Sequence, residues 1–192
     1  MSTPAPQTSS TPAAPAPEAT PPEPKYKEIP FKDLDPRLQR QIEHAEKAAE
    51  RNPSIAIEIC NGILSTNPAI VEARKILRKA QRKANPGSGK SMTNIFRGIT
   101  NTPFVLKARS QTKADPTDVL ESAEKLLASN PSNIQALRLE ANAAHAMGLW
   151  ATAAFAYECI RDVEPDDADN LMALGNALIE AAQPKEAIKV GE

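Results

Sequence analysis

One short stretch has residue types that bind phosphate in many nucleotide-binding proteins. Residues 84–91 read Ala-Asn-Pro-Gly-Ser-Gly-Lys-Ser, close to the G-x4-G-K-S pattern, in which backbone amides and a lysine surround the phosphates. Ala84 replaces the first glycine, and the mechanism also needs a strand before the loop and a helix after it. Here a basic helical pattern precedes the loop, and no strand-like run is present. We therefore interpret this stretch as a loop that ends a helix, and nucleotide binding is the weaker alternative.

Histidine and cysteine, the other residues suited to chemistry, show no reactive arrangement. His44 and His145 are the only histidines, and neither lies at a recognised metal-ligand spacing from another ligand. No serine, cysteine or carboxylate accompanies a histidine in a nucleophile arrangement. Cys60 and Cys159 each lie in an apolar helical stripe, which is typical of a buried structural thiol. The sequence thus predicts a protein that is not an enzyme and holds neither a metal nor a cofactor.

The composition favours stacked helices. Seven glycines and 4% aromatic residues in 192 suit neither a β-sandwich nor a β-barrel. No basic start followed by an apolar core marks a secretory signal, so a cytoplasmic location is the default expectation. Residues 141–157 have no charged side chain besides His145, but Gly148 interrupts them and eight of the seventeen are alanine, so we do not expect a membrane span.

A repeat organises the second half of the chain. Two helical segments, 133–147 and 150–163, are joined by a break at Gly148, and this pair lies between Pro131 and Pro165. Each segment has one apolar stripe that needs covering, and the segment after Pro165 repeats the first of them. A repeat with this period, about 34 residues, predicts a solenoid of helix pairs. The stripes consist of Leu137, Ala141 and Ala144, then Ala153, Ala156, Tyr157 and Ile160, then Leu171, Leu174, Gly175 and Leu178.

These motifs resemble the tetratricopeptide repeat (TPR) family, whose pattern is W-x2-L-G-x2-Y, then A-x3-F, then P. Leu171-x2-Leu174-Gly175-x2-Leu178 matches the first half with aliphatic residues in place of the aromatic ones, and Ala153-x3-Tyr157 with Pro165 matches the second half. One departure is Glu140, which stands where an apolar residue is usual. The resemblance implies an all-α fold, a right-handed superhelix of helix pairs that acts as a protein-binding scaffold.

The chain divides into four parts. Residues 1–30 hold nine of the eighteen prolines and few large apolar side chains, which predicts a disordered tail. Residues 36–84 predict TPR-like helices that start at Asp35-Pro36 and Asn52-Pro53, and residues 85–116 a basic irregular segment or a degenerate repeat. Residues 117–192 contain the TPR-like repeats, the last of them incomplete, so either another subunit covers this end or the sequence belongs to a longer array.

One face of the first helix in each repeat is the predicted binding surface. In the resembled family these helices line a concave groove that holds an extended peptide or a helix, and the side chains at matching positions here are spaced 3, 4 and 3 residues apart. We expect the two asparagines to bind a peptide backbone, the arginine to pair with an acid and the apolar residues to accept an apolar side chain. The alternative interpretation is that these side chains lie on helix faces that contact only water. The predicted residues are Gln135, Arg138, Asn142, His145, Asp169, Met172, Asn176 and Ile179.

A basic stretch gives the chain a second predicted surface. From Arg74 to Lys113 there are eleven basic residues and no acidic one. The stretch could bind nucleic acid, lie on an anionic membrane, or pair with the acidic C-terminal repeats of the same chain or of another copy. We favour the third interpretation, and an adaptor for membranes or nucleic acid is the alternative function. The patch on its first helix comprises Arg74, Lys75, Arg78, Lys79, Arg82 and Lys83.

Overall fold

The computed structural model describes residues 26–86 and 115–191, and every regular element in these residues is a helix. The prediction of an all-α fold is therefore confirmed over the described part of the chain. Residues 1–25 of the predicted tail and residues 87–114 of the predicted basic segment lie outside it. A short 3-10 turn, Phe31–Asp33, precedes the helices, which are α1 (Pro36–Arg51), α2 (Pro53–Thr66), α3 (Val71–Ala84), α5 (Pro116–Ser129), α6 (Ile134–Ala146), α7 (Trp150–Arg161), α8 (Ala168–Glu180) and α9 (Pro184–Gly191).

Short polar side chains begin four of these helices. Each is an Asp or Asn whose side-chain oxygen accepts a hydrogen bond from a backbone N–H of the first turn, which would otherwise have no partner. In α1 and α5 a proline follows directly, because its fixed φ suits the first helical position. The capping residues are Asp35 for α1, Asp115 for α5, Asn133 for α6 and Asp167 for α8.

The turns inside the two C-terminal pairs need a left-handed residue. Gly148, between α6 and α7, has φ 71°, and Leu149 N–H donates to the Ala144 carbonyl at 2.8 Å. The equivalent turn between α8 and α9, one repeat period later, places Ala182 at φ 58°. Glycine adopts this conformation freely, whereas a Cβ atom makes it costly. The second turn therefore holds local strain that the first does not.

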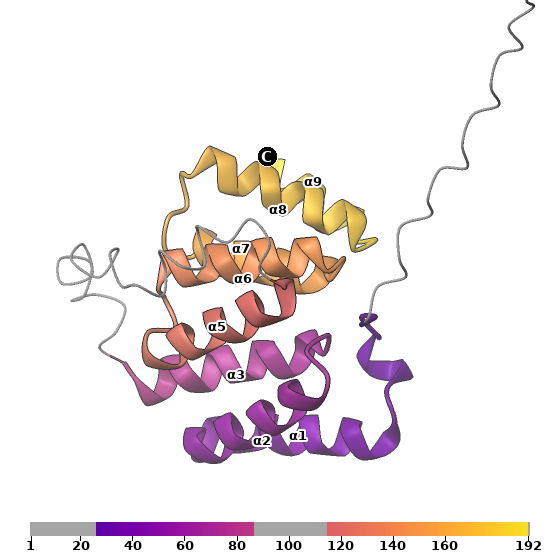
Figure 1. Cartoon of the computed structure of the whole chain (residues 1–192), viewed down its shortest axis with the longest axis vertical. Coiled ribbons are helices and arrows are strands. Elements are labelled where there is room, and N and C mark those ends of the chain that lie inside the picture. The colour runs from indigo at the N-terminus through magenta and orange to yellow at the C-terminus, as the bar shows by residue number, and fades with distance from the viewer. Residues whose placement is uncertain (1–25, 87–114, 192) are drawn as a thin grey trace, which may run out of the picture.

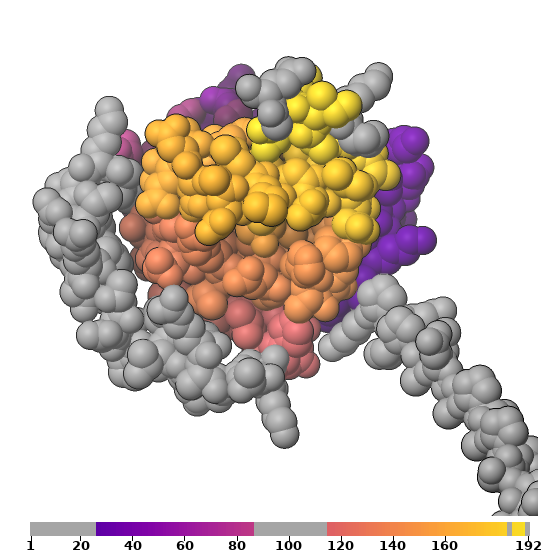
Figure 2. Space-filling view, turned by 90° about the horizontal axis from the view of Figure 1, so that it is seen from above, coloured from indigo at the N-terminus to yellow at the C-terminus, as the bar shows by residue number. Residues whose placement is uncertain are grey.

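Helices that follow one another in the chain pack side by side in two blocks. Figure 1 shows α1 and α2 at one end of the stack, then α3, α5, the pair α6 and α7, and finally α8 and α9. In Figure 2, which looks down on the opposite end, α8 and α9 form the outer surface. Within the described residues, no helix is both long and apolar enough to cross a membrane.

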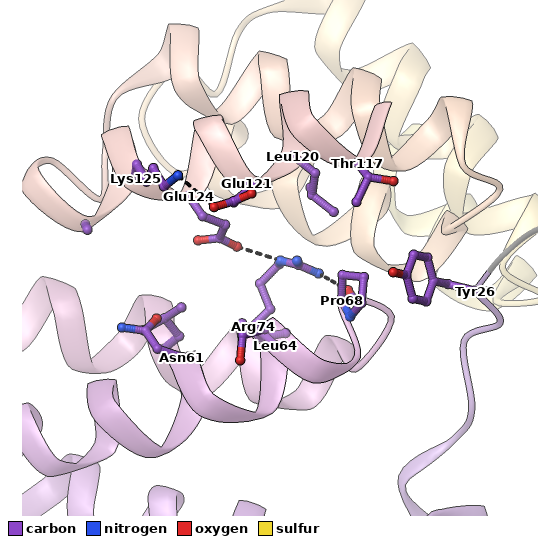
Figure 3. Close-up of a pocket in the computed structure, with 13 residues that line it drawn as sticks. Tyr26, Asn61, Leu64, Pro68, Arg74, Thr117, Leu120, Glu121, Glu124 and Lys125 are labelled. Carbon is purple, nitrogen blue, oxygen red and sulfur yellow. Dashed lines mark hydrogen bonds and ion pairs between the residues drawn. The ribbon is translucent and has the colours of Figure 1, made fainter. Parts of the chain in front are cut away.

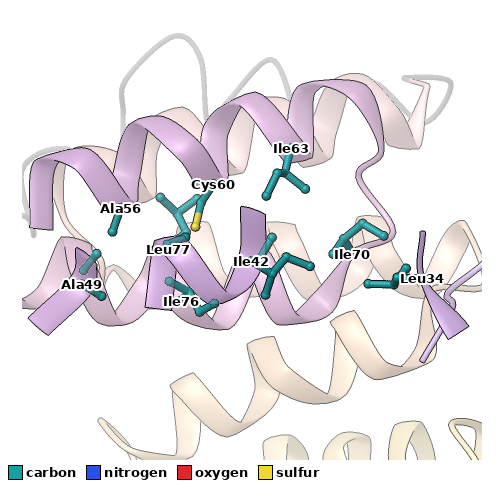
Figure 4. Packing of buried hydrophobic residues seen from close by; sticks show 12 residues of the cluster. Leu34, Ile42, Ala49, Ala56, Cys60, Ile63, Ile70, Ile76 and Leu77 are labelled. Carbon is teal, nitrogen blue, oxygen red and sulfur yellow. The ribbon is translucent and has the colours of Figure 1, made fainter. Parts of the chain in front are cut away.

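Each block has its own apolar core. In the first block α1, α2 and α3 bury a cluster that includes Ile42, Cys60 and Leu77 (Figure 4). In the second block most of the predicted stripe residues face inward, and Leu137 and Leu174 are fully buried. Tyr157, Leu171 and Gly175 are only partly buried. Buried positions that recur after 34 residues include Glu140 and Leu174, Ala143 and Ala177, and Ala144 and Leu178, so the buried faces follow the predicted repeat period at these positions.

Helix α3 joins the two blocks. It runs beside α7 in the same direction, because Arg74 near its start reaches Thr152 near the start of α7, and Arg82 near its end reaches Asp162 just after the end of α7. Ala69, just before α3, belongs to the core of the second block. The face of α3 that meets this block is polar, however, so the contact between the blocks depends on specific charged groups.

Candidate functional site

The predicted face of α6 is exposed except at its arginine. Gln135, Asn142 and His145 are all exposed, while Arg138 is half-buried. The His145 ring meets the ring of Trp150 edge-on, with 4.8 Å between centroids. The asparagine and glutamine amides are thus open to a ligand, and the imidazole already has one aromatic contact.

Arg138 has a structural partner. Its guanidinium forms an ion pair with Asp167, the residue that caps α8 through the Asn170 N–H. The Asn170 N–H and Arg138 together hold the pKa of the Asp167 carboxyl below its usual value. Arg138 therefore connects the exposed face of α6 to the start of α8, and its charge is already engaged within the chain.

The predicted face of α8 exposes two large apolar side chains. Met172 is 65% exposed and Ile179 59% exposed, and Asp169 and Asn176 beside them are exposed as well. A Cβ atom added to Gly175, between them, would meet no atom within 4 Å. This face therefore combines apolar side chains with open space next to the helix backbone.

The six residues of the predicted basic patch do not form one surface. Arg74 and Arg78 are each 1% exposed and point into the molecule. The exposed Lys79 and Lys83 both pair with Glu50 of α1. Arg82 pairs with Asp162, and Lys75 lies over the ring of Phe155, 5.9 Å from its centroid. All six thus have partners within the chain, and the other five basic residues of the stretch lie outside the described residues.

Arg74 and Arg78 belong to a buried cluster of four charges between the blocks. Arg74 Nε lies 2.7 Å from Glu124 of α5 and 3.0 Å from Glu140 of α6. An NH2 group of Arg78 lies 3.2 Å from Glu124 and 3.1 Å from Glu140. Two positive and two negative charges thus neutralise each other where neither arginine reaches water. Of the three interpretations of the basic stretch, these contacts match pairing with the acidic C-terminal repeats of the same chain.

The two carboxyls of this cluster have different proton affinities. Complete burial, only partly offset by Arg78 and Arg74, raises the pKa of Glu140 to about 7. Burial acts the same way on Glu124, but there the two arginines outweigh it and lower the pKa. Glu140 is therefore the group in this cluster that takes up a proton first as the pH falls.

A groove opens beside this cluster between the two blocks (Figure 3). Its volume is about 490 Å³, and α2, α3 and α5 contribute its walls. Tyr26 stands at the end where α5 begins, and the Arg74–Glu124 ion pair crosses the groove. The groove is lined by Tyr26, Asn61, Leu64, Ser65, Pro68, Arg74, Leu77, Thr117, Leu120, Glu121, Glu124, Lys125 and Ala128. Sequence reasoning missed it, because its walls come from helices far apart in the chain.

Residues before α1 tie the two blocks together. The Glu28 carboxylate accepts hydrogen bonds from Ala151 N–H at 2.8 Å, Thr152 N–H at 2.7 Å and the Thr152 hydroxyl at 2.7 Å. A negative charge is favourable at the start of a helix, where the backbone N–H groups are unpaired. Phe31 packs against the first core, whereas Ile29 is 37% exposed.

The described part of the chain holds no cluster of metal-binding side chains and no thiol with a lowered pKa. Within residues 26–86 and 115–191, no three side chains of the metal-binding types come together. Cys60 and Cys159 are buried free thiols, and burial raises the pKa of Cys60 to about 12 and that of Cys159 to about 11. Neither thiol is therefore a nucleophile at neutral pH.

No protein-family model, curated protein or solved structure matches this chain.

Proposed function

We propose that this protein is a tetratricopeptide-like interaction scaffold, whose α6 and α8 faces bind a peptide or helix of a partner protein. The right-handed superhelix and the cytoplasmic location are parts of the same proposal. The observation that carries it is the exposure of Met172 and Ile179, at 65% and 59%, on a helix whose opposite side buries Leu174, Ala177 and Leu178. Neither side chain is needed for the core, so both are free to contact a partner.

The two faces contribute different interactions. Removing the exposed area of Met172 and Ile179 from water favours binding by about 1 kcal/mol for each side chain. Asn142 and Asn176 are exposed at matching positions of α6 and α8, where their amides can hydrogen-bond a peptide backbone. Arg138, through Asp167, fixes the spacing of the two helices. We therefore assign Arg138 a positioning role in place of the partner contact that the sequence suggested.

The alternative function, an adaptor for membranes or nucleic acid, has less support. Binding to phosphate groups needs accessible cations. Arg74 and Arg78 are buried, and Lys79, Arg82 and Lys83 have carboxylate partners. The described part of the patch thus offers few free positive charges to an anionic surface.

A capture experiment with matched variants tests the proposal. The face variant carries Asn142→Ala, Met172→Ser, Asn176→Ala and Ile179→Ser, and the control carries Arg40→Ala, Glu43→Ala and Lys47→Ala at exposed positions of α1. Partners cross-linked in cells and identified by mass spectrometry are expected with the wild type and the control but not with the face variant. Recovery of the same partners by all three proteins would contradict the proposal. Circular dichroism and thermal melting check that each variant folds.

A further inference from the structure

The exposed face of α8 has the geometry of a socket for another helix. Met172, Gly175, Asn176 and Ile179 lie at positions i, i+3, i+4 and i+7, the four positions that surround an inserted side chain when helices pack as knobs into holes. Gly175 has open space where its side chain would be. A side chain from a facing helix therefore fits above Gly175, between Met172 and Ile179.

The matching position on α6 has no such socket. Ala141, one repeat period before Gly175, is fully buried in the core. Its neighbours on the exposed side, Arg138 and His145, already contact Asp167 and Trp150. Only α8 of the two helices thus combines open space with two exposed apolar side chains.

One edge of the socket is acidic. Asp169 and Glu180 are exposed, and neither forms an ion pair with a described residue. They are eleven positions apart in α8, which is about 16 Å along a helix. Residues 133–183 contain eight acidic and two basic residues. Four of the acidic residues, Glu140, Asp162, Glu164 and Asp167, already pair with arginines, whereas Asp169 and Glu180 do not. A facing helix with positive charges at its margins is favoured here, as at the flanking positions of a coiled coil.

We propose that the partner segment bound by α8 is a basic amphipathic helix. One apolar side chain of this helix enters the space above Gly175, and lysine or arginine residues on its margin pair with Asp169 and Glu180. This inference rests on the proposed function, because it names the class of partner for the same face. It adds two requirements, a helical ligand and a positive charge on it.

Synthetic peptides added to the full-length protein test both requirements. The probe is a peptide of about 21 residues, roughly six helical turns, with leucine at spacings of 3 and 4 and lysine elsewhere. One comparison peptide has glutamate in place of lysine, and another has serine in place of leucine. Fluorescence anisotropy is expected to show the leucine–lysine peptide binding at least about tenfold more tightly than either comparison. Its affinity is expected to fall as salt is added.

Variants of α8 locate the binding. Gly175→Leu fills the socket and is expected to weaken binding about tenfold, without loss of thermal stability, because leucine favours a helix more than glycine does. Asp169→Asn with Glu180→Gln is expected to weaken binding several-fold at low salt only. The control, Glu43→Gln with Glu46→Gln on the exposed side of α1, is expected to bind as the wild type does.

The outcomes separate the inference from the proposed function. Equal binding of the glutamate peptide, or no effect of Gly175→Leu, overturns the basic-helix partner. Tight binding of the serine–lysine peptide overturns it too, because charge alone would then explain the affinity. The proposed function still holds after these results if the capture of partners from cells depends on the α8 face. If that capture does not depend on the α8 face, both the proposed function and this inference are wrong.

Discussion

Arg78 of α3 and Glu140 of α6 are 62 residues apart in the chain, yet their charged groups lie 3.1 Å apart in the interior. Together with Arg74 and Glu124 they form the polar contact between two apolar cores. Buried ion pairs add little net stability, but removing one partner leaves an uncompensated charge away from water. The cluster therefore constrains which surfaces of the two blocks can meet.

Substituting Arg78 alone is expected to destabilise the protein. Arg78→Met leaves Glu124 and Glu140 with Arg74 as their only cation, which costs about 3 kcal/mol at pH 8, where both carboxylates are charged. Arg78→Met with Glu140→Leu keeps one positive and one negative charge, so it is expected to recover at least about 1 kcal/mol relative to the sum of the single changes. Urea unfolding of the four proteins in this cycle measures the coupling. Additive effects would show that the two side chains act independently.

The stability of the wild type is expected to depend on pH through Glu140. Its folded-state pKa of about 7 lies above the ordinary value of 4.5, so the folded protein binds this proton more tightly than the unfolded chain. The stability that the protein gains from this tighter proton binding is fully present below pH 4.5 and is lost as the pH rises through 7.

Comparison with Glu140→Gln isolates this effect, because glutamine does not titrate. The difference in free energy of unfolding, wild type minus variant, is expected to decrease between pH 4.5 and 7. Glu124, whose pKa is lowered, lies in the same cluster and interacts with Glu140, so the difference reports the titration of the two carboxyls as a pair. A difference that stays constant with pH would mean that Glu140 has no raised pKa.

The turn between α8 and α9 is expected to tolerate glycine better than its native residue. Ala182 has φ 58°, so Ala182→Gly is expected to raise the stability by about 1 kcal/mol by relieving the strain. Gly148→Ala is the matched opposite. Gly148 has φ 71°, and a Cβ atom added there would meet no atom within 4 Å. Gly148→Ala is therefore expected to lower the stability by a similar amount, through backbone strain alone. Thermal melting of both variants measures the effect, and equal melting temperatures would exclude it.

Glu28 is expected to hold the start of α7 against the first block. Glu28→Ala removes the acceptor of three hydrogen bonds from Ala151 and Thr152, at a cost of about 1–2 kcal/mol, as for the loss of a helix cap. Hydrogen exchange is expected to accelerate at these two amides while the middle of α2 stays protected. Unchanged exchange at Ala151 would contradict the role of Glu28. Glu43→Ala, at an exposed position of α1, is the control.

Local sequence patterns predicted the helices and their buried faces well. The Asp-Pro pairs determine helix starts through a side-chain cap and the fixed φ of proline, so Pro36 and Pro116 were predictable as first residues. Pro53 was predictable from its ring alone, because Asn52 makes no side-chain cap hydrogen bond. The apolar stripes of α6 to α8 were also predictable, since each depends on spacing within a single helix.

The groups that join the blocks were not predictable from local patterns. The arginines of α3 lie among lysines, and a charged run usually faces water. A signal was present, because Arg74, Arg78 and Gln81 follow Pro68 at the same intervals as Leu137, Ala141 and Ala144 follow Pro131. Polar residues at core positions, together with Glu140, indicate a buried charged contact. Glu28 gave no such signal, since its partners lie in the distant second block.

The charged contact between α3 and the second block has a consequence for how the chain assembles. Repeated helix pairs resemble one another, so their apolar faces can stack in several wrong orders while the chain folds. If a neighbour without carboxylates covers α3, two guanidinium groups are left buried without partners. The four charges therefore destabilise stacks in which the helix pairs have assembled in the wrong order.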